Sequence, residues 1–357
     1  MSICVGVPTE IKPQEGRVAL TPAAAAELVS TGVRVCLQAG AGAASGYADP
    51  LYARAGAELL DSAEAVYAAA DVLVKVKEPV GRELELLRPH QRLFSFLHLA
   101  ALPELTERLC QLGVTAIAFE TVQDQGTLPI LQPMSEIAGR IAVQVGAHLL
   151  HSPQGGRGKL LGGVPGVGRG DVVVLGAGHA GGSAARLAAA MGAGVTVFDL
   201  NPKRLGEMQA AAPNINARYA NQEDIRKSVA QADLVIGAVL LPGAAAPRVV
   251  SGEDVSNMIE GTVVVDISVD QGGCIATTRP TDYDDPTYVV DGVTHFCVTN
   301  MPGAVPRTAT QALCGAMMPY LKVLLRDDWR ENRILRDAIN VESGKIVHPA
   351  LDGSVNR

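Results

Sequence analysis

The stretch that most constrains how this chain folds is GAGHAG, residues 176–181. The apolar run VVVL comes directly before it and predicts a buried strand, and the small residues after it predict a helix. A second apolar run then ends at Asp199. Strand, glycine turn, helix, strand and acidic residue follow one another in the order of a dinucleotide-binding fingerprint. We therefore expect a nucleotide-binding βαβ unit in this part of the chain.

Each residue of this fingerprint has a physical task. Gly176 permits a tight turn, Gly178 lets backbone amides approach a pyrophosphate, and Gly181 allows close packing of the helix on the sheet. The phosphates meet the positive end of the helix. Asp199 binds both ribose hydroxyls and repels a 2′-phosphate, so the sequence favours NAD over NADP. The alternative is a glycine turn in an α/β fold that binds no nucleotide.

The rest of the chain repeats the same strand-then-helix order, and its 357 residues suffice for two domains. Most of the expected strands are apolar on both faces, which indicates parallel sheets covered by helices on both sides. In the first third we expect strands at 3–8, 33–38, 71–79, 93–100 and 115–122, and helices at 21–32, 61–70 and 103–113. Further strands are expected within 232–243, 261–268 and 294–298.

Two long helices are expected at 134–150 and at 308–325, the second interrupted near Pro319. We predict an α/β protein with two Rossmann-like, doubly wound parallel-sheet domains joined by these long connecting helices. Residues 1–133 and 302–357 form the expected substrate, or catalytic, domain, and residues 134–301 form the expected NAD-binding domain.

The overall charge and the cysteines argue against several classes of protein. The formal net charge of −7 disfavours a nucleic-acid or acidic membrane partner. The six cysteines show no C-x-x-C pair and no zinc spacing, so we expect reduced, buried thiols of a cytoplasmic protein. The longest uncharged stretch, 234–247, is shorter than the roughly 20 residues that a membrane-spanning helix needs. His148 and His151 share a helix face without a carboxylate beside them, so we expect no metal site.

A histidine interrupts the apolar stretch LFSFLHLAAL, residues 93–102. If the stretch is a strand, Phe94, Phe96, His98 and Ala100 share one face, because side chains alternate along a strand. His98 is then either a core histidine bonded to a backbone carbonyl or a catalytic acid or base at the end of the strand.

Other ionisable residues also follow expected strands. Asp266 and Asp270 lie in DISVDQGG, where either one transfers a proton or orients water, unless both are ordinary turn residues. Lys75 and Lys77 lie in KVKEP, where one lysine could hold a substrate carboxylate or carbonyl. Arg17 lies in the loop after the first strand, and an arginine grips a carboxylate with two hydrogen bonds. Taken singly, each of these cations is more typical of a solvated surface.

Taken together, these motifs resemble those of the alanine dehydrogenase family, which includes the NAD-binding part of nicotinamide nucleotide transhydrogenase. The resemblance covers essentially the whole chain. It rests on VGVPTEIKPQEGRVALTP, LVKVKEP, FLHLA, PMSEIAGRIAVQVGAHLL, GGVPGV, GAGHAG, DLVIGAVLLPGAAAPRVV, DISVDQGGC and NMPGAVPRTAT, in this order.

The resemblance implies roles for individual residues. Arg17 and Lys77 match residues that bind the substrate, and His98 and Asp270 match the family's active-site histidine and aspartate. His179 departs from the family, which usually has a smaller uncharged residue at this position. The cofactor site that the resemblance implies consists of Ser135, Gly176, Gly178, His179, Ala180, Gly181, Asp199, Arg204, Val239, Leu240, Ile267, Asp270, Arg279, Val298, Asn300 and Met301.

The resemblance also implies a reaction, the reversible NAD-dependent oxidative deamination of L-alanine to pyruvate and ammonium by a cytoplasmic homohexamer. Arg17 and Lys77 would hold the carboxylate, His98 would shuttle protons, and Asp270 would position water. The expected partners are these small molecules and NAD, with no nucleic acid and no membrane.

Three alternatives stay open. The first is a dehydrogenase or imine reductase of the same family that acts on another small amino acid or 2-oxo acid. The second is a transhydrogenase-like NAD(H)-binding subunit, which would not require the histidine of FLHLA together with DQGGC. The third is a non-catalytic NAD-binding protein that has kept the fold.

Overall fold

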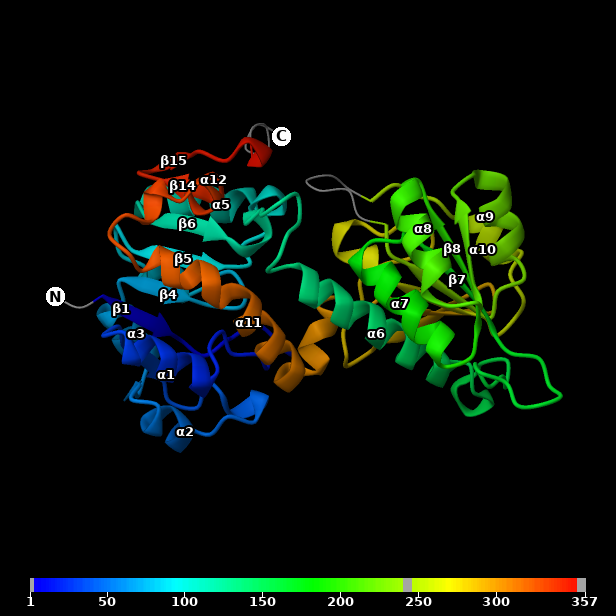
Figure 1. Ribbon diagram of the computed structural model, residues 1–357, viewed down its shortest axis with the longest axis horizontal. Helices are drawn as coiled ribbons and strands as arrows, with labels where there is room; N and C mark the ends of the chain where they lie inside the picture. Colours follow the sequence, from blue (N-terminus) through cyan, green and yellow to red (C-terminus); the bar gives the residue numbers. More distant parts are fainter. Residues whose placement is uncertain (1–2, 240–245, 352–357) are drawn as a thin grey trace. The chain divides into compact units, whose positions relative to one another are not determined.

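The structure of the chain is a computed structural model, and it describes residues 3–239 and 246–351. The chain divides into two compact units, one formed by Met1–Met134 with Gly303–Arg357 and the other by Ser135–Pro302. Each unit is built around one β-sheet with helices on both faces (Figure 1). In the part of the chain that the structure describes, no helix is both long and apolar enough to cross a membrane.

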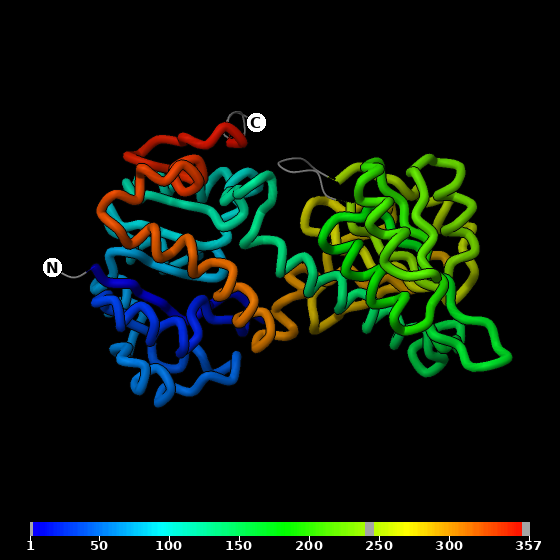
Figure 2. The backbone as a smooth tube through the Cα atoms, in the orientation of Figure 1, coloured from blue at the N-terminus to red at the C-terminus, as the bar shows by residue number. Residues whose placement is uncertain are grey.

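The first unit contains an eight-stranded sheet with the order β15-β14-β6-β5-β4-β1-β2-β3. The strands β1 to β6 run parallel to one another, whereas β14 is antiparallel to both β6 and β15. The strands are β1 (Cys4–Val7), β2 (Arg34–Gln38), β3 (Glu58–Leu60), β4 (Val72–Val74), β5 (Arg92–Ser95), β6 (Thr115–Ala118), β14 (Ile339–Glu342) and β15 (Lys345–Ile346). The C-terminal segment thus returns to the first sheet, where β14 pairs with β6, and the red part of the tube in Figure 2 lies against the unit that begins in blue.

Helices cover both faces of this sheet. The side chains of Leu73, Leu93 and Ala116 point to one face, where they form a core with α3 and α5. Figure 1 shows α11 crossing β4 and β5 on the other face. The helices are α1 (Pro22–Ser30), α2 (Asp49–Arg54), α3 (Ala63–Ala69), α4 (Glu83–Leu86), α5 (Pro103–Leu112), α11 (Pro306–Leu324) and α12 (Arg333–Asp337). Short 3₁₀ helices are η1 (Ala43–Ser45), η2 (Leu99–Ala101), η3 (Phe119–Thr121), η7 (Trp329–Glu331) and η8 (Pro349–Leu351).

The second unit contains a seven-stranded sheet with the order β12-β13-β11-β10-β7-β8-β9, in which β12 alone is antiparallel. Its strands are β7 (Asp171–Leu175), β8 (Gly194–Asp199), β9 (Ile215–Tyr219), β10 (Leu234–Gly237), β11 (Val263–Asp266), β12 (Thr287–Val290) and β13 (Val293–Phe296). Its helices are α7 (His179–Ala190), α8 (Pro202–Ala211), α9 (Gln222–Val229) and α10 (Gly252–Ser256), with η4 (Ser152–Gln154) and η5 (Ile267–Gln271). The helix α6 (Gln132–Leu149) leads into this unit and η6 (Met301–Ala304) leads out of it.

Local sequence signals explain where several helices begin and end. Thr21 is the N-cap of α1, where its hydroxyl accepts a 3.2 Å hydrogen bond from the amide of Ala24, and Pro22 is the first helical residue. Gly113 ends α5 in a left-handed conformation with a φ of 67°. These elements agree with the sequence patterns, and the α/β class with two Rossmann-like parallel-dominated sheets is confirmed.

Several structural predictions were wrong in detail. The strand expected at 71–79 ends at Val74, and the strand expected at 115–122 ends at Ala118. The strand expected at 93–100 ends at Ser95, and His98 has left-handed backbone angles, so Phe94, Phe96, His98 and Ala100 do not share a strand face. The strand stops because the amides of Leu97 and His98 donate to the carboxylate of Glu120 instead of to a neighbouring strand.

The helix expected to be interrupted near Pro319 is continuous from Pro306 to Leu324. Proline removes one backbone hydrogen bond from a helix. The residues around it, Met317, Met318 and Leu321, are all buried, and the burial of this apolar face offsets the loss.

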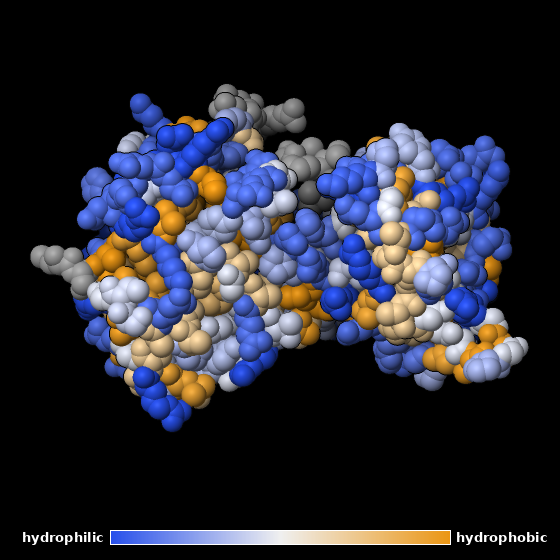
Figure 3. Space-filling view, in the orientation of Figure 1, coloured by the Kyte–Doolittle hydropathy of each residue, from blue (hydrophilic) through white to orange (hydrophobic). Residues whose placement is uncertain are grey.

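The surface is mainly hydrophilic on the face drawn in Figure 3, where hydrophobic side chains form separate patches. Among the described residues, Leu160, Val164 and Val167 are exposed large hydrophobics in the loop between α6 and β7. Val164 and Val167 pair as an isolated antiparallel bridge, so this glycine-rich stretch is a small hairpin.

Candidate active site and dinucleotide site

The glycine turn after β7 has the geometry of a phosphate-binding loop. Gly176 has a φ of 98°, and a Cβ atom there would lie 2.5 Å from the carbonyl oxygen of Ala238. A Cβ atom at Gly181 would collide with the carbonyl oxygen of Gly176. At Gly178, the N-cap of α7, a Cβ atom would have no other atom within 4 Å. The turn therefore needs glycine at its two closed positions and leaves room for a ligand at the third.

Asp199 ties this turn to the end of β8. One carboxylate oxygen, Oδ2, accepts a 2.6 Å hydrogen bond from the amide of Ala177, and Oδ1 accepts a 2.7 Å bond from the amide of Asn201. The guanidinium of Arg204 lies 3.9 Å from Oδ2. The acidic residue at the end of the second strand and the basic residue on α8 thus both lie beside the glycine turn.

A small hollow lies at the N-terminus of α7, and its lining carries charge. It is lined by Glu136, Ala177, Gly178, His179, Arg186 and Arg204. His179 is exposed as the first residue of α7, at the positive end of the helix dipole. Three basic side chains around a helix N-terminus suit an anionic group such as a pyrophosphate.

Helix α6 approaches the same turn closely. A Cβ atom at Gly139 would collide with the carbonyl oxygen of Ala180, so glycine permits the contact between α6 and α7. This contact brings Glu136 to the hollow, and the neighbouring Ser135 is a half-buried residue of the same helix. The family resemblance implied Ser135, whereas Glu136 and Arg186 were not predicted. Arg186 follows the glycine turn closely in the sequence, which was a usable signal, but no local signal marks Glu136.

The two aspartates after β11 differ sharply. Asp266 is fully buried, and its carboxylate accepts hydrogen bonds from the amides of Ser268 and Cys274, both 2.9 Å, and from the hydroxyl of Thr278, 2.8 Å. It is therefore a structural residue that closes the loop. Asp270 is exposed, on η5.

The other residues of the predicted cofactor site follow the carboxyl ends of adjacent parallel strands. Val239 follows β10 and Ile267 follows β11, and these strands neighbour each other beside β7. In open α/β sheets, ligands bind at this edge. Arg279 stacks over the Tyr288 ring at 4.2 Å. Val298 and Met301 are buried, and Asn300 has a φ of 58°. Leu240 lies outside the described residues.

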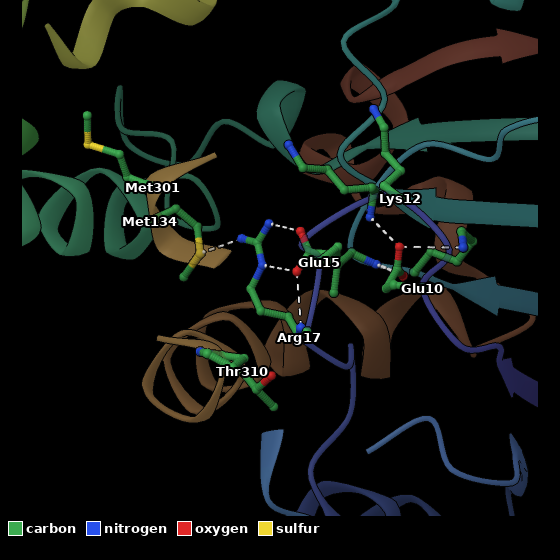
Figure 4. A network of polar contacts seen from close by, with 12 residues as sticks. Glu10, Lys12, Glu15, Arg17, Met134, Met301 and Thr310 are labelled. Atoms are coloured by element: carbon green, nitrogen blue, oxygen red, sulfur yellow. Dashed lines mark hydrogen bonds and ion pairs between the residues drawn. The ribbon is translucent and has the colours of Figure 1, made fainter. Parts of the chain in front are cut away.

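In the first unit, Arg17 is buried and fixed by Glu15. Its Nε lies 2.7 Å from Glu15 Oε1, and its Nη2 contacts Glu15 Oε2 (Figure 4). Its Nη1 donates to the sulfur of Met134 at 3.3 Å. A thioether is a weak acceptor. Nη1 can therefore donate instead to a stronger acceptor, such as a carboxylate oxygen.

The two lysines after β4 have different surroundings. Lys75 is 1% exposed and lies between Glu83, at 2.5 Å, and Glu10, at 3.5 Å. Burial opposes its charge, but the two carboxylates outweigh burial and raise the pKa of Lys75. Lys77 is half-buried, and its backbone amide donates to Glu10 at 3.2 Å. Lys75 thus forms buried, structural ion pairs with Glu10 and Glu83.

His98 follows β5 and carries a half-exposed ring, with its side chain 44% accessible. Its Nδ1 lies 3.9 Å from Oε1 of Glu120, and the ring stacks parallel to Phe96 at 6.0 Å. Burial in the core, the other interpretation of this histidine, is wrong. Glu120, on η3 after β6, was not predicted, although it is an ionisable residue within the apolar stretch TAIAFETV just as His98 is within LFSFLHLAAL.

These polar residues gather at one edge of the sheet. Arg17, Lys77, His98 and Glu120 follow β1, β4, β5 and β6, which are adjacent and parallel. Their carboxyl ends therefore lie at the same edge. Two cations, an imidazole and a carboxylate at one edge suit a small carboxylate substrate that exchanges a proton.

Metal ligands are not part of this arrangement. Among residues 3–239 and 246–351, no group of histidine, cysteine, aspartate or glutamate side chains is placed to hold a metal ion. The rings of His148 and His151 contact each other edge-on at 5.8 Å.

Comparisons with known proteins agree with this geometry. Residues 6–138 match the family model described as alanine dehydrogenase/PNT, N-terminal domain, and residues 142–349 match the model of its C-terminal domain. The alanine dehydrogenase of Mycobacterium tuberculosis is 50% identical over 349 residues, 96% of this chain and 94% of the relative. That of Bacillus subtilis is 46% identical over 353 residues, 97% of this chain and 93% of the relative.

Solved structures give the same result. A structure of L-alanine dehydrogenase superposes with a TM-score of 0.95 at 46% identity and covers 99% of both chains. A transhydrogenase from Sinorhizobium meliloti superposes with a TM-score of 0.84 at 27% identity, covering 97% of this chain and 99% of that one.

Proposed function

The chain belongs to the alanine dehydrogenase/PNT family, and we propose from this premise that it catalyses the reversible oxidative deamination of L-alanine to pyruvate and ammonium, with NAD as cofactor. The observation that carries the proposal is the 50% identity to an alanine dehydrogenase over 96% of the chain. The residues at the edge of the first sheet supply the chemistry that this reaction needs.

The residues of the second unit fit a nicotinamide dinucleotide. Gly178 leaves open space at the N-terminus of α7, and His179, Arg186 and Arg204 line the adjoining hollow. These groups would hold the pyrophosphate, and Asp199 would hold the adenosine ribose and disfavour a 2′-phosphate. A nicotinamide held there would supply the acceptor for the hydride from the α-carbon of alanine.

The remaining steps depend on side chains of the first unit. Arg17 binds the substrate carboxylate through Nη1, which replaces the weak thioether acceptor of Met134 by a charged one. Lys77 holds the carboxylate or carbonyl oxygen. His98 first takes a proton from the α-ammonium group and passes it to solvent, which leaves the free amine for hydride removal. It then takes a proton from the water that adds to the iminium carbon and gives this proton to the nitrogen. As the C–N bond breaks and ammonia leaves, His98 takes the hydroxyl proton and the carbonyl of pyruvate forms. Asp270 orients that water.

We also propose the cytoplasm as the site of this activity and a homohexamer as the assembly, both by analogy with the family. A dehydrogenase or imine reductase for another small amino acid or 2-oxo acid, and a transhydrogenase-like subunit, are the competing proposals. The first shares every residue named above, so the substrate is decided by assay.

The test follows NADH absorbance with purified protein, pyruvate and ammonium. Parallel reactions use 2-oxobutyrate, glyoxylate and NADPH, and H98A serves as the inactive control. We expect ammonium-dependent NADH oxidation with pyruvate that H98A abolishes. Tight NADH binding without turnover of pyruvate would refute the substrate assignment and direct the search to other 2-oxo acids or to a partner subunit.

A further inference from the structure

We propose that Glu120 is a positioning residue for His98, whose carboxylate fixes the backbone of the histidine and faces one nitrogen of its ring. The inference rests on the proposed function, in which His98 moves the proton. Both residues lie in the same unit, His98 after β5 and Glu120 on η3 after β6, and these strands are paired in parallel.

The backbone of His98 has a conformation that is uncommon for any residue with a Cβ atom. His98 has a φ of 51° and a ψ of 35°, which is the left-handed region. A Cβ atom is crowded by the following carbonyl in this region, so glycine is the usual occupant. A histidine persists here only when its surroundings determine the conformation.

Glu120 provides the hydrogen bonds that hold His98 in this backbone conformation. Its Oε1 accepts a 2.6 Å hydrogen bond from the amide of His98, and it also accepts the amide of Leu97 at 3.2 Å. Two consecutive amides aimed at one anion form a concave binding site that extended backbone cannot form. Hydrogen bonds to an ionised acceptor are short and strong. The carboxylate therefore ends β5 and turns the chain at the position where His98 is needed.

The same carboxylate lies beside the imidazole. Nδ1 of His98 is 3.9 Å from Oε1 of Glu120, and the ring of Phe96 lies parallel to the imidazole with an interplanar angle of 6°. The carboxylate thus faces Nδ1, so that Nε2 is the ring nitrogen left for the substrate. Phe96 and Glu120 together define the orientation of the ring.

Glu120 is itself held in place. Its neighbour Phe119 packs edge-on against Phe94 at 4.6 Å and Phe96 at 5.1 Å. On the other side, the hydroxyl of Thr121 donates to the carbonyl of Ala338 at 2.9 Å, which ties η3 to the C-terminal segment. Because these contacts hold η3 in place, the carboxylate of Glu120 has little freedom to move. The position of Glu120 therefore determines the position of His98.

The carboxylate of Glu120 also acts on a second histidine, His348. His348 lies just before η8 in the C-terminal segment; burial lowers its pKa, and the charge of Glu120 acts against burial. The C-terminal segment is thus electrically coupled to the residue that positions His98. A change at Glu120 would therefore alter the titration of His348 as well as the position of His98, so kinetic constants separate the two effects better than a pH profile does.

The experiment compares E120A, E120Q and a structural control, Q91A, in the oligomeric enzyme. Glutamine keeps an oxygen that can accept the amide of His98, whereas alanine removes it. Gln91 stands at the opposite end of β5, where its side chain donates to the carbonyls of Tyr67 and Ala70 at 2.8 Å each. Q91A therefore weakens the same unit without contact to His98. The readouts are kcat, the KM for pyruvate, the melting temperature, and NADH binding as a check on the second unit.

We expect E120A to lower kcat by about 100-fold, the loss that a displacement of roughly 1 Å produces, with a much smaller change in KM and unchanged NADH binding. E120Q should recover most of kcat. Q91A should lower the melting temperature and leave kcat intact. Unchanged kcat in E120A would overturn the proposal, and so would equal losses of kcat in E120A, E120Q and Q91A, because these indicate only a structural role.

A crystal structure of E120A separates this proposal from the proposed function. If the wild-type enzyme fails to convert pyruvate, the proposed function fails, but the positioning role still predicts that residue 98 leaves the left-handed region in E120A. If the wild-type enzyme is active and residue 98 keeps its φ and its ring orientation in E120A, the positioning role fails alone.

Discussion

Glu15 holds Arg17 in a buried ion pair of two parallel contacts, so that the carboxylate of one residue defines the plane of the other's guanidinium. Both side chains are almost inaccessible to water. A guanidinium has a rigid, planar set of donors, and a bidentate partner fixes its orientation. The arginine that we propose for substrate binding is therefore oriented before any ligand arrives.

Replacing Glu15 should damage both stability and binding. E15A removes the carboxylate that neutralises the buried charge of Arg17 and fixes its plane, which costs up to about 3–5 kcal/mol. We expect a lower urea midpoint and a higher KM for pyruvate, with E15Q intermediate because its amide oxygen still accepts from Nε. An E15A protein with wild-type stability and KM would show that the pair is dispensable.

The glycines of the nucleotide turn should tolerate no methyl group. G181A places a Cβ atom against the carbonyl oxygen of Gly176, so we expect loss of NADH binding measured by fluorescence titration. The matched control is G206A on α8, where a Cβ atom meets open space. This change should raise stability by up to about 1 kcal/mol and leave NADH binding unchanged. Equal NADH affinity in both variants would contradict the assignment of the turn.

Asp199 should control the choice between NADH and NADPH. D199N removes the charge that repels a 2′-phosphate, while its amide oxygen can still accept the amide of Ala177. With Arg204 nearby, we expect NADPH to gain and NADH to lose in kcat/KM. The measurement is the ratio of kcat/KM for the two cofactors. R204A is the counterpart: in the D199N background it should remove the gain with NADPH.

The two lysines after β4 should respond differently to the same change. K75M leaves the carboxylates of Glu10 and Glu83 buried without their cation, so we expect a loss of about 3–5 kcal/mol in the free energy of unfolding. K77M should unfold near the wild-type midpoint and raise the KM for pyruvate. Urea denaturation and steady-state kinetics on both variants decide the matter, and a reversed pattern would exchange the two roles.

Acid should destabilise the second unit through His295. This buried ring bonds the carbonyl of Val293 through Nδ1 and the hydroxyl of Thr277 through Nε2, and burial lowers its pKa. Below about pH 6.5, the ordinary pKa of histidine, the unfolded state binds a proton that the folded state refuses. Stability from this group is therefore complete above that pH and falls as the pH decreases.

The check is the pH dependence of unfolding from pH 7 down to pH 5 for wild type and H295Q. Glutamine offers a neutral amide of similar reach, so the variant should lose stability less steeply on acidification. H348Q serves as the comparison in the first unit, because burial lowers the pKa of that histidine too. Parallel wild-type and H295Q curves would exclude His295 as the source.

The sequence predicted the parts of the fold that depend on local patterns. The glycine turn at Gly176, the acidic residue Asp199 and the capped helix at Thr21 all follow from short stretches with a strong physical reason. The antiparallel strands β12, β14 and β15 were missed, because their pairing partners are set by the tertiary structure and their stretches are short.

The candidate site shows the same division. The apolar runs drew attention to His98 and to the lysine pair, and only the family resemblance selected His98 and Lys77 as site residues. The end of β5 before His98 was misplaced. That end depends on Glu120, which lies 22 residues further along the chain. Periodicity within a window carries no information about a carboxylate that arrives from the next strand. Glu15 was missed for a different reason: it is buried, and nothing in EGR distinguishes it from a surface residue.

The left-handed backbone at His98 has a cost in stability that the proposed role of the residue would explain. Glycine or asparagine would occupy this conformation more comfortably than histidine, and a left-handed L-residue gives up about 1–2 kcal/mol. A copy of this gene released from selection for catalysis would gain stability by exchanging the histidine. If the proposed role is right, residue 98 is therefore a position at which stability and catalysis favour different residues.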